Sequence, residues 1–479
     1  ASDVYKRQVA TRSTPSSGTD GPEPAEPRAD DAPPEVRAPE AAPDEPGQGP
    51  AEPGPAAPAV DTERRAFFLD FGKQTLSAVG QVAGMTNAAS RTASAIANEL
   101  LGLEESPADR PAFMRSGATT DPVVSAAAPA AEDAFRSAYR LAGEELVILD
   151  QRGIPEALDE VAALRGSDVA YYLRLGVARG GALMAQLAAY GLALTAAERS
   201  ELPVEQRRVE LLRTERALVE SRPSSRAIRW AMERMHSAIE ELPESTSGTD
   251  LAQALRVAAD TIADDIRTAN ASVAAALVER LPVPSDRPLA VLLHGSQGAL
   301  AGGLVGTGIT ALAKLRDAGR ELRIFVTEGR PFMDGARLAS WELRQGDLDH
   351  RIVPDSAVAW LLARERLDVV LISAEWIAQN GDVGALVGAR GIAQLVQAMP
   401  DGDARPQVIV SGLDACRDPD TIDGAAIPAE LRPAKDLTAY LADVPVRSSD
   451  ALVPATDVVP AAAIDMLVTE HELQAGADS

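Results

Sequence analysis

Short apolar runs alternate with amphipathic segments along the second half of the chain. The runs rich in Val, Ile and Leu are predicted to be strands, at 289–295, 322–328, 350–354, 367–373 and 406–412. Between them, apolar residues recur at helical spacing over 303–319, 335–346, 357–366 and 387–399. This alternation predicts right-handed crossovers and an α/β fold, with a doubly wound, Rossmann-like parallel sheet as one domain over 283–475.

The region before this domain has a different pattern. Apolar residues recur at positions i, i+3 and i+4 in four segments, 156–164, 181–198, 206–220 and 226–242. We therefore predict a helical N-terminal subdomain over 134–282, packed on the sheet domain.

Composition changes the expectation for the start of the chain. Residues 1–62 are crowded with Pro, Glu, Asp, Ala and Gly and hold few large apolar side chains. Such a segment cannot bury enough surface to offset its conformational entropy, so we predict a disordered acidic tail. Helical apolar spacing over 63–104 predicts an amphipathic extension, a candidate contact for a protein partner, and 105–133 is predicted to be a linker.

Charge and rare residues narrow the class of protein. The formal net charge is −25 and the pI about 4.6, whereas binding a nucleic-acid backbone requires clustered Lys and Arg, so we expect no nucleic acid. No uninterrupted apolar run reaches the length of a membrane span, so no membrane association is expected. The single cysteine, Cys416, cannot form an intrachain disulfide, and the four histidines lack metal-ligand spacing. These features favour a cytoplasmic protein without a metal.

The stretch VLLHGSQGALAGGLVGTG, from Val291, leads from a predicted strand through a glycine-rich turn into a predicted helix. Backbone N–H groups in such a turn can hold an anion, so Gly295, Ser296, Gln297 and Gly298 are candidate contacts for a phosphate. The turn lacks the Walker A pattern and a clean Gly-x-Gly-x-x-Gly fingerprint. A tight turn that binds nothing is the open alternative.

Six further segments occur in one order: LVILDQRGIP, VARGGALMAQLAAYG, SRPSSRAIRWAMERM, TEGRPFMDGARLASWEL, IAQNGDVGALVG and DTIDGAAIPAELR. The series, from about Leu146 to Glu470, resembles the methylthioribose-1-phosphate isomerase family. That family is related to ribose-1,5-bisphosphate isomerases and to the regulatory subunits of the eukaryotic initiation exchange factor. The resemblance implies aldose–ketose isomerisation of a sugar phosphate in methionine salvage, without organic cofactor or metal, by a homodimer.

The resemblance also implies individual site residues. The family's Arg-Gly-Ala-Pro loop begins at Arg179 and Gly180, which are expected to contact the substrate phosphate, and its Arg-Pro-Thr-Ala segment gives a second arginine, Arg222. The catalytic aspartate of Gly-Ala-Asp-Arg corresponds to Glu375 in the sequence Ser-Ala-Glu-Trp. The Asn-Gly-Asp motif is kept, with Asn380 as its first residue.

Three departures alter this implied site. The catalytic cysteine of Thr-His-Cys-Asn falls on Gly295, and the glutamine of Gln-Gly-Ala-Arg-Leu falls on Asp334. The Asn-Lys pair that follows Asn-Gly-Asp is Ala385 and Leu386. The neighbouring hydroxyl of Ser296 is not a simple substitute, because an unassisted hydroxyl is a far weaker acid than a thiol.

Two hypotheses remain. In the first, the chain is a divergent isomerase in which Glu375 transfers the proton while Arg179 and Arg222 hold the phosphate. In the second, it is a non-catalytic sugar-phosphate- or nucleotide-binding regulatory module, like the exchange-factor subunits. His294 matches the family's histidine and is expected to be a buried, hydrogen-bonded structural residue.

Overall fold

The computed structural model describes residues 137–400, 402, 405–437, 451–471 and 473–475. These residues all belong to one unit of the chain. The tail predicted at 1–62, the extension at 63–104 and the linker at 105–133 lie outside the described residues. The boundaries assigned to the five segments remain predictions.

A three-stranded antiparallel sheet opens the described chain. It consists of β1 (Tyr139–Ala142), β2 (Glu145–Leu149) and β3 (Glu160–Ala163), in that order. The helix predicted over 156–164 is therefore wrong, since β3 occupies its second half and pairs with β2. A short apolar run fits both periodicities, and here the neighbouring buried strand decides between them.

The next segment is helical, as predicted. It contains α3 (Gly166–Leu175), α4 (Gly181–Glu198), α5 (Val204–Ser221), α6 (Arg226–Glu240) and α7 (Gly248–Arg280). Helix α4 is apolar around most of its circumference and is buried among α3, α5, α6 and α7. The glycines at 180 and 181 stand at its N-terminus, which faces the larger sheet described below. Gly180 has φ +99° and closely approaches Ala301.

The predicted parallel sheet is confirmed. Its strands run in the order β14-β13-β9-β7-β4-β5-β6, and all neighbours are parallel except β13 and β14. Their bounds are β4 (Leu289–His294), β5 (Leu322–Thr327), β6 (His350–Val353), β7 (Val369–Ile377), β9 (Gln407–Ser411), β13 (Met466–Val468) and β14 (Leu473–Ala475). The chain moves outward from β4 to β6 and then returns to β7 on the other side of β4. This reversal places a crevice at the carboxyl ends of β4 and β7.

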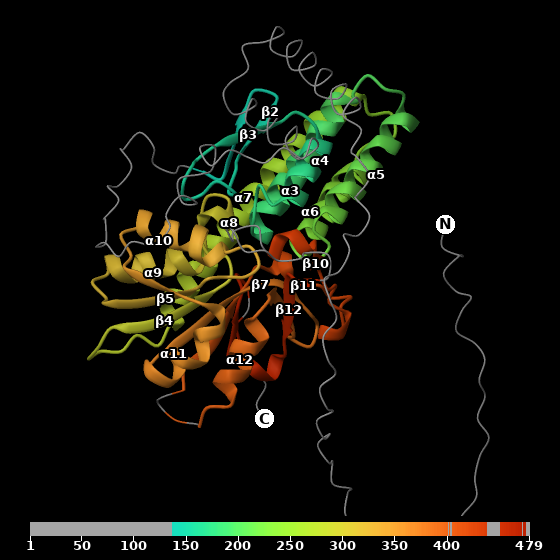
Figure 1. Ribbon diagram of the computed structural model, residues 1–479. Coiled ribbons are helices and arrows are strands. Elements are labelled where there is room, and N and C mark those ends of the chain that lie inside the picture. Colours follow the sequence, from blue (N-terminus) through green and yellow to red (C-terminus); the bar gives the residue numbers. More distant parts are fainter. Residues whose placement is uncertain (1–136, 401, 403–404, 438–450, 472, 476–479) are drawn as a thin grey trace, which may run out of the picture. The chain divides into compact units, whose positions relative to one another are not determined.

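Helices cover both faces of this sheet. Helices α9 (Gly308–Asp317) and α10 (Ser340–Gln345) lie on one side, and α11 (Val358–Arg364) and α12 (Ala389–Gln397) on the other (Figure 1). The strands β4 and β7 are buried over most of their length, which is why they read as continuous apolar runs. The α/β class is thus confirmed.

Strand β7 changes partners halfway along. Its first half pairs in parallel with β4 and β9, whereas its end pairs antiparallel with β8 (Val383–Leu386), which in turn pairs with β12 (Thr456–Val459). The register shifts between Ala374 and Trp376, so Glu375 is the extra residue of a bulge. A bulge changes the direction of a side chain, and this one interrupts the regular alternation of side chains along β7 at Glu375.

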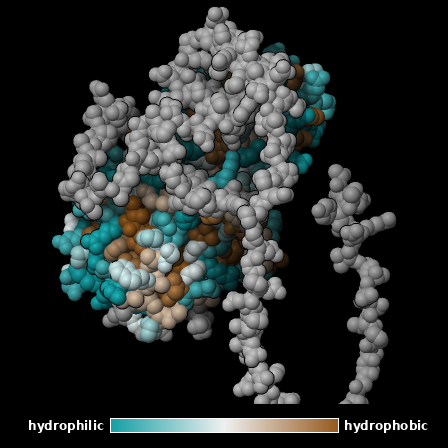
Figure 2. Space-filling view, viewed as in Figure 1, coloured by the Kyte–Doolittle hydropathy of each residue, from teal (hydrophilic) through white to brown (hydrophobic). Residues whose placement is uncertain are grey.

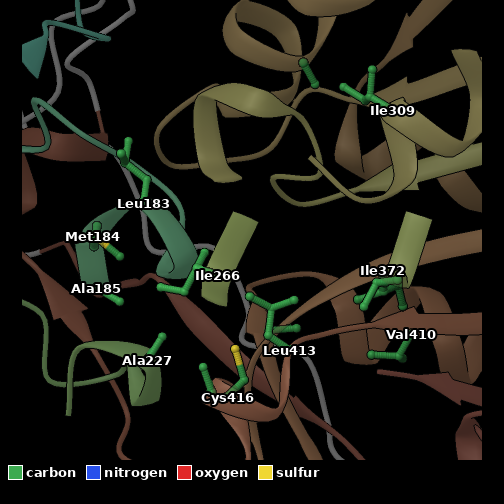
Figure 3. Packing of buried hydrophobic residues seen from close by; sticks show 14 of the residues in the cluster. Leu183, Met184, Ala185, Ala227, Ile266, Ile309, Ile372, Val410, Leu413 and Cys416 are labelled. Carbon is green, nitrogen blue, oxygen red and sulfur yellow. The ribbon is translucent and has the colours of Figure 1, made fainter. Parts of the chain in front are cut away.

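One hydrophobic core joins the helices to the sheet. Figure 3 shows side chains from α4 (Leu183), α7 (Ile266), β7 (Ile372), β9 (Val410) and the turn after β9 (Cys416), which belong to one buried cluster. Continuous packing of this kind holds the N-terminus of α4 in a fixed position against the strand ends.

The face seen in Figure 2 exposes apolar residues among polar ones. The exposed apolar side chains of the described chain include Ile352, Trp360 and Leu395. Apolar surface of this kind is what the predicted homodimer would bury, and that homodimer remains a prediction. Among the described residues, no helix is long and apolar enough to cross a membrane.

Candidate functional site

The glycine-rich turn after β4 is fixed by hydrogen bonds. The Gln297 side chain donates to the carbonyl oxygens of Leu371 (2.8 Å) and His294 (3.3 Å). The short helix α8 (Ala299–Gly302) follows, and the N–H of Leu300 donates to Oε1 of Glu342 at 2.8 Å. The backbone donors expected to hold a phosphate are therefore directed, at Leu300, to a carboxylate of the protein itself.

Glu342 approaches the turn closely. A Cβ atom at Gly298 would lie 2.0 Å from its Oε2, so any other residue there would force the Glu342 carboxylate to move. Burial raises the pKa of Glu342 to about 7, although the backbone N–H groups of Leu300 and Ala299 act in the opposite direction. A buried carboxyl thus anchors the turn.

Gly295 has a backbone conformation and surroundings that suit only glycine. Its φ is +90°, a backbone conformation that residues with a side chain rarely adopt. A Cβ atom there would lie 2.3 Å from Oγ of Ser373. The position at which the resemblance places the catalytic cysteine therefore has no room for a side chain while Ser373 keeps its place.

Arg179 lies at the end of the loop that leads into α4. Its Nε donates to Oδ2 of Asp334 at 2.9 Å, and its guanidinium stacks 3.5 Å from the centre of the Phe332 ring. Its backbone N–H donates to Oε1 of Gln151. Within the described part of the chain, Nη1 of Arg179 and Oδ1 of Asp334 are buried without a hydrogen-bond partner. The arginine is held firmly, and its Nη1 is a buried donor without a partner among the described residues.

Arg222 forms a second buried ion pair. Its Nε lies 3.1 Å from Oε1 of Glu430, and the side chains are only 7% and 5% exposed. Burial lowers the pKa of Arg222, and nearby Arg179 lowers it further. Burial by itself raises the pKa of Glu430. The net pKa is nevertheless lowered, because the charge of Arg222, a hydrogen bond from the Ser224 hydroxyl and the charges of two further arginines outweigh burial. Glu430 is ionised at neutral pH and neutralises Arg222.

Glu375 faces the N-terminus of α4. The backbone N–H of Gly181 donates to its carboxylate, and a Cβ atom on that glycine would lie 2.7 Å from Oε2. Burial raises the pKa of Glu375, and Arg222 and Arg179 partly offset this effect. The carboxylate also interacts favourably with the positive end of a long helix, so its position has a structural reason as well as a chemical one.

Two cavities meet this group of residues. A large one of about 700 Å³ is lined by Arg179, Phe332, Asp334, Glu430 and Arg432, among others. A small one of about 40 Å³ is lined by Gly181, Ser296, Gln297, Gly298, Ser373, Glu375 and Ser411. Arg179, Asp334, Ser296 and Gln297 line a narrow space that shares residues with both. Of these spaces, only the large cavity has the volume of a whole sugar phosphate, because the small one has room for a water molecule or a single ligand oxygen.

The structure therefore brings most of the predicted residues together. Gly180 and Arg222 lie just behind the cavity walls, where Gly180 contacts Ala301 and Arg222 is paired with Glu430. Asn380 lies apart, exposed in the turn between β7 and β8, where its side chain bonds Asp382 and lines neither cavity.

Sequence reasoning missed three residues of this region. Glu430 belongs to the segment DTIDGAAIPAELR, so the resemblance carried a signal for it. Ser373 stands where the family's Gly-Ala-Asp-Arg motif has its glycine, which was also a visible departure. Glu342 likewise belongs to the segment TEGRPFMDGARLASWEL, but a carboxylate in a predicted helix is normally solvated, so its burial was not expected.

The remaining reactive groups are structural. His294 is fully buried, with Nδ1 2.9 Å from Oγ1 of Thr327 and Nε2 3.2 Å from the Leu386 carbonyl oxygen, and burial lowers its pKa. Burial raises the pKa of the Cys416 thiol to about 12, so it is protonated at neutral pH. In the described residues, no group of His, Cys, Asp and Glu side chains is arranged to hold a metal ion.

Comparisons with known proteins agree with this fold. Methylthioribose-1-phosphate isomerase of Herpetosiphon aurantiacus is 30% identical over 329 residues, which cover 68% of this chain and 89% of that protein. The crystal structure of 5-methylthioribose 1-phosphate isomerase from Pyrococcus horikoshii matches with a TM-score of 0.60 and 22% identity, covering 71% of this chain and 93% of that one. The delta subunit of translation initiation factor eIF-2B from A. fulgidus matches with a TM-score of 0.57 and 22% identity, covering 72% and 97%. The family model for the initiation factor 2 subunit family matches residues 177–473, and the chain belongs to that family.

Proposed function

We propose that this chain is a ligand-binding member of its family, which holds a small phosphorylated sugar or nucleotide without isomerising it. The observation that carries this proposal is the backbone at Gly295. Glycine at this position lacks the side chain on which the family's chemistry is expected to depend, and at its φ of +90°, with a Cβ atom 2.3 Å from Oγ of Ser373, any side chain would be strained.

The large cavity supports the binding part of the proposal. Its volume of about 700 Å³ is in the range of small-molecule sites. In a chain of net charge −25, its lining has more cations than anions: Arg152, Arg174, Arg179, Arg337, Arg432 and Lys435 against the carboxylates Glu220, Asp334, Glu430 and Asp436. A phosphate oxygen that displaces the atoms covering Nη1 of Arg179 would give this buried donor the partner that it lacks, and a buried donor without a partner is costly.

A second candidate function is isomerisation by Glu375 alone. The observation in its favour is the pKa of this carboxyl, which burial raises above its ordinary value although Arg222 and Arg179 lower it, as suits a group that accepts and returns a proton. The hydrogen bond from the Gly181 N–H and the positive end of helix α4 already account for the position of Glu375. We therefore rank this candidate second.

An assay in heavy water separates the two candidates. The purified chain is incubated with methylthioribose 1-phosphate, and proton NMR follows both ketose formation and exchange of the C2 proton for deuterium. We expect neither, while the sugar phosphate raises the melting temperature of the protein. Ketose formation or exchange that disappears in Glu375→Gln would instead establish the isomerase. If neither reaction nor thermal stabilisation by sugar phosphates or nucleotides is seen, the binding proposal is wrong.

Replacing Asp334 with Asn is expected to tighten anion binding. Asp334 neutralises Arg179 through a 2.9 Å contact, and the substitution removes this charge with little change in shape. The dissociation constant for the sugar phosphate should fall about tenfold, measured by calorimetry. The control is Asp264→Asn, an exposed residue of α7 outside the large cavity. Unchanged or weaker binding in Asp334→Asn would show that Arg179 does not contact the phosphate.

The cellular setting follows from the same proposal. We place the module in the cytoplasm as a homodimer, with the 63–104 segment available to a protein partner. Sedimentation of the full chain should give twice the mass of a protomer, and a monomer at micromolar concentration would contradict the homodimer.

A further inference from the structure

Gly295 and Ser373 lie side by side at the carboxyl ends of β4 and β7. The parallel register pairs His294 with Ile372, so the next residue of each strand is again adjacent. A Cβ atom on Gly295 would lie 2.3 Å from Oγ of Ser373 and 3.5 Å from its Cβ. The Ser373 hydroxyl therefore occupies the space that a side chain at 295 would need.

The two positions have exchanged their side chains relative to the family pattern. The resemblance places cysteine at 295 and glycine, the first residue of Gly-Ala-Asp-Arg, at 373, whereas this chain has glycine at 295 and serine at 373. Close-packed strand ends have no room for both side chains. If neither side chain were present, a void would remain. The departure at Gly295 is thus one half of a coupled change.

The hydroxyl of Ser373 faces the small cavity, together with other polar groups. Ser411, its register partner on β9, is 2% exposed, and its Oγ has no hydrogen-bond partner among the described residues. The Oε1 atom of Gln297, in the turn after β4, is also buried without a hydrogen-bond partner among the described residues, and Gln297 lines the same cavity. Buried polar atoms are normally bonded, and a cavity of about 40 Å³ holds a water molecule or one oxygen of a ligand.

We propose that Ser373 is a ligand-binding residue that has replaced the missing side chain at 295. With Ser411 it binds one hydroxyl or carbonyl oxygen of a sugar phosphate beside Glu375, and a water molecule when the ligand is absent. The inference rests on the proposed function, in which the phosphate lies near Arg179 in the large cavity. The space lined by Ser296, Gln297 and Arg179 lies between the two cavities and has a volume of only about 10 Å³, so a ligand that reaches both cavities must displace side chains there.

The exchange itself is tested without a ligand. Denaturant unfolding is measured for the wild type, Gly295→Ala, Ser373→Gly and the double variant of the full chain. Gly295→Ala should raise the unfolding equilibrium constant at least about tenfold more in the wild type than in the Ser373→Gly background, since only the wild type has the steric overlap. Ser411→Gly is the control background and should give no relief. Equal effects in all backgrounds would overturn the exchange.

The ligand contact is tested by calorimetry with methylthioribose 1-phosphate. Ser373→Ala should weaken binding about tenfold through the loss of one buried hydrogen bond, and Ser237→Ala, on the exposed side of α6, should have no effect. If the wild type binds and Ser373→Ala binds equally well, the assignment of Ser373 is overturned. If the wild type binds no sugar phosphate, the proposed function and this contact both fail, and the unfolding cycle still decides the exchange.

Discussion

Replacing Arg222 with Met is expected to reduce the free energy of unfolding by about 3–5 kcal/mol. Arg222 and Glu430 are joined at 3.1 Å with side chains only 7% and 5% exposed. The substitution keeps an extended apolar side chain but leaves the Glu430 carboxylate buried without its main counter-ion. The loss should appear in denaturant unfolding at pH 7 as a lower midpoint with an unchanged slope.

The matched control is Arg216→Met on α5. Arg216 and Glu220 are 2.7 Å apart, but their side chains are 79% and 57% exposed, so this variant should lose less than about 1 kcal/mol. The double variant Arg222→Met, Glu430→Gln should regain part of the stability, because the buried charge of Glu430 is removed together with that of Arg222. A loss in Arg222→Met no larger than in Arg216→Met would show that the buried pair does not stabilise the fold.

The same pair predicts an acid limit. Because the pKa of Glu430 is lowered in the folded chain, its stabilising contribution is present above the unfolded value of about 4.5 and is lost as pH falls through the folded value. The difference between wild type and Arg222→Met should therefore shrink below about pH 4.5.

Replacing Glu342 with Gln is expected to stabilise the protein by about 3 kcal/mol at pH 8 and to have little effect at pH 4.5. Burial raises the pKa of Glu342 to about 7, so in the folded chain the carboxyl keeps its proton at pH values where the unfolded chain has lost it. Stability therefore falls as pH rises from about 4.5 to about 7. Glutamine keeps the shape and an acceptor for the Leu300 N–H, but it carries no charge.

The measurement is the free energy of unfolding of wild type and variant at half-unit steps from pH 4.5 to 8. The control is Glu220→Gln, an exposed glutamate of α5, whose profile should follow the wild type. Parallel profiles for Glu342→Gln and wild type would show that this carboxyl does not titrate in that range. A stabilised variant that also binds sugar phosphate normally would show that Glu342 anchors the turn without contacting the ligand.

The fold was largely readable from local patterns. The central residues of strands β4 and β7, 289–293 and 369–372, are apolar because a parallel sheet covered on both faces buries them, and such runs are visible without any knowledge of their neighbours. The helix predicted at 156–164 was wrong for the opposite reason. Its few apolar residues fit either periodicity, and pairing with β2 determined the outcome.

The candidate site was only partly readable. Motif order located Arg179, Arg222 and Glu375, but it gave each as a potential ligand contact. The partners Asp334 and Glu430 come from segments more than 150 residues away in sequence, so no local pattern could pair them. The bulge at Glu375 depends on the switch of β7 from parallel to antiparallel pairing, which is likewise a property of the assembled sheet.

The amino-acid sequence by itself determined the α/β class, the order of the main strands, the family and the glycine at 295, because these depend on residue type and local spacing. Only the tertiary structure decided how that glycine is used. Its left-handed backbone and the Ser373 hydroxyl beside it arise from two strands that are 78 residues apart, from 295 to 373, and meet only when the sheet forms. Side-chain space and ion pairing are properties of contacts between distant segments, and for this reason they could not be read from the chain alone.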